Sequence, residues 1–202
     1  MRSYLRSPVR LVLAALLAVG GALILAVLGA YQYLQPSLPD VTTIKDIRLQ
    51  VPLRVYSRDG KLIAQFGEQR RIPLAFEEIP PQLVNAVLAA EDDRFFEHGG
   101  VDYAGLLRAL TRHILSGERS EGGGTITMQL ARGIFLSPEK TYRRKLQEIF
   151  LAWRIERELS KQEILALYMN KMFLGQRAYG VGAAAEVYFG KTVDQLTLPE
   201  IA

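Results

Sequence analysis

One stretch of ten residues, from Glu91 to Gly100, contains most of the side chains that could do chemistry. It holds four carboxylates, an arginine, two phenylalanines, a histidine and two glycines. It also follows an apolar segment of helical character, so Glu91 is predicted where a buried helix ends. A carboxylate pressed against apolar side chains resists ionising and becomes a usable proton acceptor near neutral pH. A charged helix end followed by a polar turn is the simpler interpretation, but the interleaved aromatic residues and the motifs that follow favour chemistry.

A second candidate carboxylate, Glu148, falls within a predicted helix. Arg144 and Lys145 precede it by four and three residues, so the three side chains share one helical face. As solvated surface ion pairs they would contribute only about 0.5 kcal/mol each. Alternatively, the cations could hold a phosphate, with Arg132 and Lys140 supplying further positive charge nearby in the sequence. The spacing alone leaves both interpretations open.

Three glycines at 122–124 precede another predicted helix start. Glycines allow close backbone approach, and a helix N-terminus attracts anions, but a flexible linker would have the same composition. The stretch lacks the lysine spacing of a nucleotide-binding P-loop, which excludes ATP binding by this motif. The chain has no cysteine, so disulfides, zinc–thiolate sites and thiol nucleophiles are excluded as well.

The N-terminal region predicts a membrane anchor. Residues 11–30 contain no charged side chain, and as a helix they would span ~30 Å, the thickness of the hydrocarbon core of a bilayer. Three arginines precede this run and the next charge is Asp40, so residues 1–10 are predicted to be a cytoplasmic tail and the chain after residue 40 to lie outside the membrane. The run is longer than the apolar region of a cleaved signal peptide, which favours a retained anchor over 11–34.

The net charge of +4 on 202 residues is modest and dispersed. It disfavours a nucleic-acid partner for a domain outside the membrane and favours anionic lipid head groups.

The remaining chain is predicted to be mainly α-helical, with a small β-hairpin near the membrane after a linker over 35–50. Alternating residues around Asp59-Gly60 predict the hairpin, and Ser160 with Glu163 forms a capping box. Helices are predicted over roughly 80–92, 103–115, 125–136, 141–159 and 160–172, with a loop over 116–124. In the second of these helices the predicted buried positions are Leu106, Leu107, Leu110 and Ile114.

Five ordered blocks between residues 91 and 191 resemble the lysozyme-like peptidoglycan glycosyltransferases, the N-terminal module of class A penicillin-binding proteins. The stretch from Glu91 is similar to the E-D-x-x-F-x-x-H-x-G motif of that family, and GGGTITMQ is similar to its G-G-S-T-I-T-Q-Q. RKLQE matches R-K-x-x-E, EILALYMN matches E-I-L-x-x-Y-x-N, and RAYGVGAAAEVYFGK matches the closing segment. The resemblance implies a mainly α, lysozyme-like domain preceded by one transmembrane helix.

The resemblance also implies roles. Glu91 would be the general base that deprotonates the 4-hydroxyl of lipid II, which then attacks the lipid-linked donor with inversion and releases undecaprenyl pyrophosphate. Glu148 would be the second catalytic carboxylate, among cations near the leaving group. The substrate-binding residues that it implies are Asp92, His98, Thr125, Gln129, Arg132, Lys140, Arg144, Lys145, Tyr168 and Asn170. Phe95 would pack beneath the helix and His98 would hold the loop. A divalent cation, magnesium or manganese, could assist, and no organic cofactor is implied.

Two positions depart from the pattern of the family. Gly124 replaces a common serine and Met128 replaces a common glutamine, so we expect altered affinity rather than lost chemistry.

The resemblance implies a glycosyltransferase domain over 51–202 that is truncated at its C-terminal end and is not followed by a transpeptidase. Ser137 to Lys140 fits an S-x-x-K motif only by coincidence. The implied partners are lipid II, the growing glycan chain and membrane lipids, and proteins of cell-wall elongation or division could join them at the bacterial cytoplasmic membrane. Two alternatives stay open: a lysozyme-like murein hydrolase, and an inactive fragment that acts as a cell-wall scaffold.

Overall fold

The computed structural model describes residues 8–46, 52–67, 70–116, 124–139 and 141–201, and these fall into two compact units. The first unit, Met1–Pro39, contains helix α1 (Pro8–Leu34) and the short 3-10 helix η1 (Gln35–Ser37). Residues Arg10–Ser37 include an 18-residue window with a mean hydropathy of 2.9 and are long and apolar enough to cross a membrane. The predicted N-terminal apolar helix is therefore confirmed, while its orientation stays a prediction.

The second unit, Asp40–Ala202, is mainly helical, as predicted. Its elements in chain order are η2 (Thr42–Asp46), β1 (Leu53–Tyr56), β2 (Leu62–Phe66), β3 (Arg70–Arg71), η3 (Phe76–Glu78), α2 (Pro81–Glu91), α3 (Tyr103–Ser116), α4 (Ile126–Phe135), α5 (Tyr142–Glu158), α6 (Lys161–Lys171), β4 (Ala178–Tyr179), α7 (Val181–Phe189), η4 (Val193–Gln195) and α8 (Leu198–Ile201). The predicted loop over 116–124 falls mostly outside the described residues.

Strands β1 and β2 form the predicted antiparallel hairpin. Gly60 supplies the turn with a φ of +80°, a backbone conformation that is strained for side chains larger than that of glycine. A second pairing was not predicted: β3 and β4 are parallel, with Arg70 opposite Ala178 and Arg71 opposite Tyr179. Because more than a hundred residues separate these partners, no local pattern indicates the pairing.

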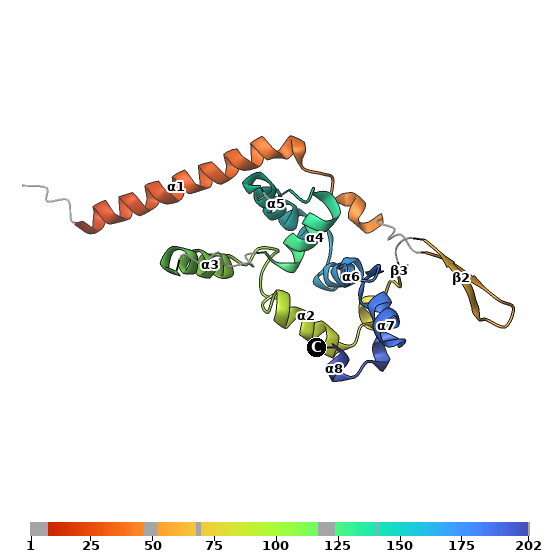
Figure 1. The fold of residues 1–202 in the computed structure, drawn as a ribbon. Coiled ribbons are helices and arrows are strands. Elements are labelled where there is room, and N and C mark those ends of the chain that lie inside the picture. The colour runs from red at the N-terminus through yellow and green to blue at the C-terminus, as the bar shows by residue number, and fades with distance from the viewer. Residues whose placement is uncertain (1–7, 47–51, 68–69, 117–123, 140, 202) are drawn as a thin grey trace, which may run out of the picture. The chain divides into compact units, whose positions relative to one another are not determined.

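Helix α4 is the central helix of this unit and packs against both α5 and α6 (Figure 1). The apolar positions of its first half are almost completely buried, with Ile126, Met128 and Leu130 each 2% exposed or less. Thr125 caps its first turn by accepting a hydrogen bond from the Met128 amide at 3.2 Å. The next two helices begin in the same way, at Thr141 and at the predicted Ser160 capping box.

Helix α3 confirms the predicted helix but only part of its predicted buried face. Leu106 packs against the buried cluster of Val101, Met128 and Ala152, whereas Leu107 is 62% exposed. The buried face is therefore narrower than the leucine spacing predicted, and Leu107 was wrongly assigned to it. The side chains of Leu110 and Ile114 lie outside the described residues.

Gly100 closes the stretch from Glu91 at a point where the chain touches α5. Its φ is +89°, and a Cβ built on it would lie 2.9 Å from Glu156 Cγ and 3.1 Å from the Ala152 carbonyl oxygen. Only glycine fits this position without displacement of the loop or of α5.

We expect Gly100→Ala to lower the free energy of unfolding by about 2 kcal/mol, through backbone strain and the clash with α5. Denaturant titration of the full chain in detergent, followed by fluorescence of the single tryptophan, Trp153, measures this, because Trp153 packs against the cluster that contains Val101. Gly99→Ala is the matched control, since a Cβ there meets no atom within 4 Å. Equal stabilities of the two variants would contradict the role of Gly100.

Candidate active site

Glu91 is the last residue of α2, and its side chain is exposed. The carboxylate is oriented from α4, because Gln129 Nε2 donates a hydrogen bond to its Oε2 atom at 2.8 Å. Gln129 is held in turn by α6, since the Tyr168 hydroxyl donates to Gln129 Oε1 at 3.2 Å. The predicted apolar surroundings of Glu91 are therefore wrong. A relay of polar side chains from two other helices fixes it instead, and leaves it accessible to a hydroxyl group.

Tyr168 is suited to the donor end of this relay. Burial, and after it the negative charge of Glu91, raise the pKa of Tyr168 to about 12, while Arg132 acts in the opposite direction. The hydroxyl therefore stays protonated at neutral pH and keeps donating to Gln129.

Asp92 and Thr125 attach α4 to the stretch after Glu91. The Asp92 side chain is 5% exposed; its Oδ2 accepts a hydrogen bond from the Ile126 amide at 3.0 Å, and its Oδ1 lies 3.0 Å from His98 Nε2. Thr125 Oγ1 donates to the Gly100 carbonyl at 2.6 Å. A carboxylate at the N-terminus of a helix also interacts favourably with the helix dipole. In the described contacts, Asp92, His98 and Thr125 thus position α4 and the loop.

Side chains of α5 and α6 contact the loop between Asp92 and Gly100. Phe95 is fully buried, as predicted, and Lys161 Nζ lies 4.2 Å from the centre of its ring. Lys161 also donates to the His98 carbonyl at 2.7 Å and pairs with Glu156 at 2.8 Å. These contacts hold the loop through the His98 carbonyl, and the His98 ring holds it through its contact with Asp92.

Glu148 is buried on α5, with a side-chain exposure of 1%. Arg144 Nε lies 3.0 Å from its Oε1, without the alignment of a hydrogen bond, and Lys145 Nζ lies 3.3 Å from its Oε2. The interpretation as a solvated surface ion pair is therefore wrong for Glu148. A buried carboxylate needs compensation by nearby cations, and these two residues provide it.

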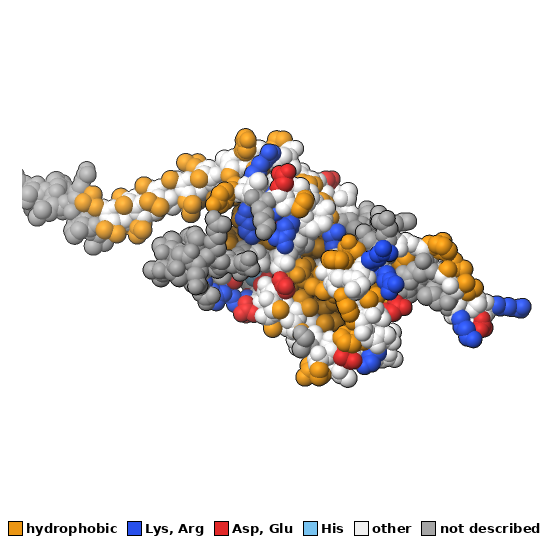
Figure 2. Space-filling model, in the orientation of Figure 1, with side chains coloured by type: hydrophobic (Ala, Val, Ile, Leu, Met, Phe, Trp, Pro, Cys, Tyr) orange, Lys and Arg blue, Asp and Glu red, His pale blue; other side chains and the backbone are white. Residues whose placement is uncertain are grey.

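The N-terminal end of α4 connects the Glu91 region to the Glu148 region. A Cβ built on Gly124 would lie 3.3 Å from Lys145 Nζ, while the Ile126 amide two residues later binds Asp92. Gly124 thus lies next to Lys145, the partner of Glu148, and Ile126 binds Asp92, the residue that follows Glu91. Figure 2 shows basic side chains gathered over α5 on the face that it presents.

Arg132 was predicted to act with Arg144 and Lys145, and the structure places it on the side of α4 that faces α6. It lies about 9 Å further along α4 than Ile126, at 1.5 Å per residue. There it lines a cavity of about 270 Å³ on the side of α4 that faces α6. The cavity is lined by Gln129, Leu130, Arg132, Gly133, Tyr168, Lys171, Met172 and Phe173. Lys171 was not predicted as a site residue, although its position three residues after Tyr168 places both on one helical face.

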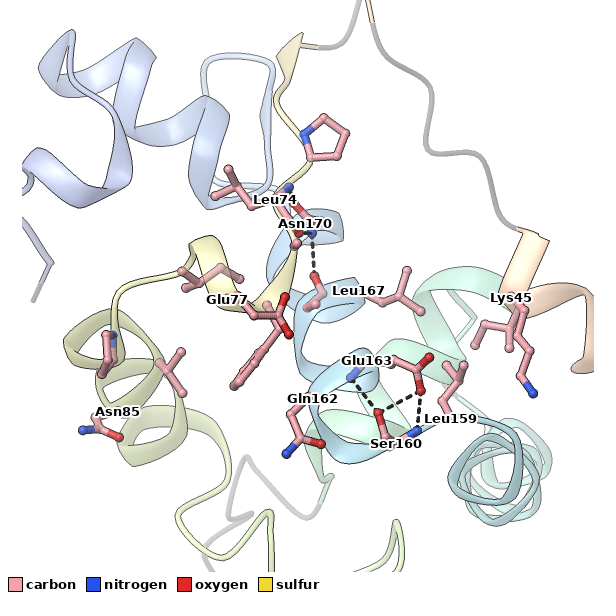
Figure 3. A pocket seen from close by; sticks show the side chains of 18 residues that line it. Lys45, Leu74, Glu77, Asn85, Leu159, Ser160, Gln162, Glu163, Leu167 and Asn170 are labelled. Atoms are coloured by element: carbon pink, nitrogen blue, oxygen red, sulfur yellow. Dashed lines mark hydrogen bonds between the residues drawn. The ribbon is translucent and has the colours of Figure 1, made fainter.

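Asn170 faces a different part of the unit. Its Oδ1 accepts from the Leu74 amide at 2.9 Å, and its Nδ2 donates to the carbonyls of Leu74 and Ala166 at 2.7 and 2.8 Å. It borders a larger cavity, of about 1370 Å³, between α2, η3 and α6 (Figure 3). In the described contacts its amide fixes the backbone before η3. Lys140 lies outside the described residues.

Among the side chains that the structure describes, no group of three or more His, Cys, Asp or Glu could hold a metal ion. The only two carboxylates assigned to catalysis are already engaged, Glu91 by Gln129 and Glu148 by two cations. Within the described residues the structure identifies no carboxylate cluster of that kind, and a divalent cation stays a prediction.

Residues 59–202 match the family model described as Transglycosylase. The chain belongs to this transglycosylase family. The match covers the hairpin turn, both candidate carboxylates and every described residue of the relay around Glu91.

Two relatives are similar in sequence to this transglycosylase chain over most of its length. Penicillin-binding protein 1A of Escherichia coli (strain K12) is 60% identical over 177 residues, which are 88% of this chain and 21% of that protein. Penicillin-binding protein 1A of Vibrio cholerae is 58% identical over 176 residues, 87% of this chain and 21% of that protein. The chain thus spans about a fifth of the length of the curated relatives it matches.

A 2.6 Å crystal structure of penicillin-binding protein 1A from Haemophilus influenzae also matches this transglycosylase chain. It is 32% identical and covers 77% of this chain and 13% of its own, with a TM-score of 0.35.

If Asp92 anchors α4, Asp92→Asn should lower the free energy of unfolding by about 1–3 kcal/mol, because an amide nitrogen replaces one of the two acceptor oxygens that face Ile126 and His98. Asp93→Asn removes the same charge from an exposed neighbour and should change stability by less than about 0.5 kcal/mol. Parallel denaturant titrations of the two variants measure the difference, and matching curves would refute the anchor.

Proposed function

We propose that the chain is a peptidoglycan glycosyltransferase that polymerises lipid II with inversion and releases undecaprenyl pyrophosphate. The observation that supports this most strongly is Glu91, an exposed carboxylate held in place by Gln129 within a transglycosylase chain. We also propose that α1 anchors the chain in the bacterial cytoplasmic membrane, with the N-terminus inside and the transglycosylase unit outside, because arginines precede α1.

Glu91 acts as the general base. Its Oε2 is occupied by Gln129, and its Oε1 has no hydrogen bond within the described part of the chain, so it can accept the proton of the 4-hydroxyl. As the 4-hydroxyl loses its proton, its oxygen attacks the anomeric carbon of the lipid-linked donor, and the bond between that carbon and the diphosphate oxygen breaks. Attack from the opposite face inverts the configuration. Positioned proton transfer of this kind contributes typically about 10²–10⁴-fold to a rate.

Arg144 and Lys145 stabilise the negative charge that grows on the leaving diphosphate. Glu148 holds the two cations in one place, since it pairs with both from within the core. Preorganised charges of this kind cost no rearrangement at the moment of reaction. Glu148 therefore acts on the leaving group through Arg144 and Lys145.

The replacement of the common serine of the family by Gly124 directly affects the group formed by Arg144, Lys145 and Glu148. A serine there would place its side chain against Lys145 Nζ, which lies 3.3 Å from the Cβ position. The glycine leaves this side of the ammonium open, which supports an effect on donor affinity rather than on the base. Met128 is buried in the core, 1% exposed, so that departure acts on packing rather than on substrate.

Two other functions make different predictions. A murein hydrolase would also use a glutamate, but it would not need the cations around Glu148, and it would release short muropeptides from finished cell wall. A scaffold would bind its partners without turnover. Incubation of the chain with lipid II therefore separates the three, since only the glycosyltransferase makes polymer.

Replacement of Glu91 by Gln should abolish polymerisation, at least about 100-fold, because it removes the base and preserves the shape. Polymer formed from labelled lipid II, resolved by gel electrophoresis, measures the loss, and lipid II binding should persist. Glu97→Gln, an exposed carboxylate of the same stretch, is the control and should stay active. Near-normal polymerisation by Glu91→Gln would rule out the base assignment.

Lys145→Ala should weaken donor binding and slow turnover about tenfold at subsaturating lipid II, through the loss of one charged contact to the diphosphate. Arg143→Ala removes an exposed cation from the same helical turn and should leave the rate unchanged. Initial rates over a range of lipid II concentrations compare the two. An unchanged rate for Lys145→Ala would mean that Lys145 serves only Glu148.

A further inference from the structure

Lys171 and Arg132 form a second cationic site on the side of α4 that faces α6. Both line the cavity of about 270 Å³ next to Gln129, the residue that orients Glu91. At ~30 Å³ for each water, such a space can take one small charged group with some of its hydration. The cavity thus adjoins the base through Gln129 and differs in location from the Glu148 group.

The Lys171 side chain is half-buried and lies along α4. A Cβ built on Gly133 would lie 3.5 Å from Lys171 Cε, an ordinary van der Waals distance, so the lysine stem lies close to this point of α4. Burial, and next the positive charge of Arg71, lower the pKa of Lys171. Both effects disfavour the ammonium when the cavity is empty, and an anion in the cavity would reverse them.

Neither cation has a counter-charge in the described part of the chain. The ion pairs between cations and carboxylates in that part involve other residues, and the charge of Arg132 acts on Tyr168. Arg144 and Lys145 differ, because Glu148 already compensates them. A half-buried lysine beside an exposed arginine, both without a carboxylate partner among the described residues, creates a net positive site, and such a site favours an anionic ligand.

We propose that Lys171, together with Arg132, binds one anionic oxygen group of the glycan substrate, a phosphate or a carboxylate, beside the base. This inference rests on the proposed function and adds Lys171 to the residues that contact substrate. The two cation groups then hold two different anionic groups, one next to Gly124 before α4 and one beside Arg132, further along the helix. The cavity supplies a point charge from Lys171 and a planar, bidentate donor from Arg132.

The test is equilibrium binding of fluorescent lipid II to the full chain in detergent, in a Glu91→Gln background so that bound substrate is not consumed. Lys171→Met keeps the length of the side chain and removes the charge, and it should weaken binding about tenfold. Lys171→Arg should restore most of the affinity. Lys61→Met removes an exposed charge from the hairpin turn, with 84% of that side chain exposed, and should have no effect.

The source of the anion is identified with a second substrate, in which the carboxylates of the stem peptide are amidated. If Lys171→Met still weakens binding of this amidated substrate, the site binds a phosphate. If Lys171→Met no longer weakens its binding, the site binds a carboxylate. Circular dichroism verifies the fold, and Lys171→Gln replaces Lys171→Met if the latter does not fold.

Equal affinity of Lys171→Met and the parent would overturn the inference and leave the proposed function standing. A parent that neither binds nor polymerises lipid II before the Glu91 substitution would overturn both.

Discussion

The candidate active site depends on the contact between the Asp92 carboxylate and the first amide of α4. Asp92 follows the proposed base directly in the chain, and Ile126 opens the helix that carries Gln129. This hydrogen bond, together with the one from Thr125 to the Gly100 carbonyl, fixes the stretch from Glu91 to Gly100 relative to α4. Because Gln129 then reaches Glu91, the anchor and the orienting residue act on adjacent positions of the chain. The Asp92 side chain thus satisfies the first amide of α4 and also positions the base.

Features encoded by neighbouring residues were predictable. The hairpin follows from Asp59-Gly60, and the start of α6 follows from Ser160 and Glu163, because in both cases the interacting groups lie within a few residues of one another. The ordered motifs likewise pointed to the family. Capping and turn chemistry are local, so a sequence displays them directly.

Features that depend on distant segments were not predictable. Leu107 has the spacing of a core residue, but only packing decides which leucines of α3 are covered. Arg132 appeared to belong with Arg144, yet α4 carries it to the α6 side, next to Lys171. Glu91 likewise depends on Gln129, 38 residues away, for its orientation rather than on the apolar helix that precedes it. In each case the partner lies on another helix.

The anchoring role of Asp92 is tested most directly by the turnover number of Asp92→Asn with lipid II, at a temperature where circular dichroism shows the variant folded. If Asp92 fixes α4 relative to Glu91, kcat should fall about tenfold or more while KM for lipid II changes little, because positioning of the base is lost and substrate contacts remain. Asp93→Asn should retain the parent kcat. A folded Asp92→Asn variant with the kcat of the parent would contradict the dependence of the base on the Asp92–Ile126 contact.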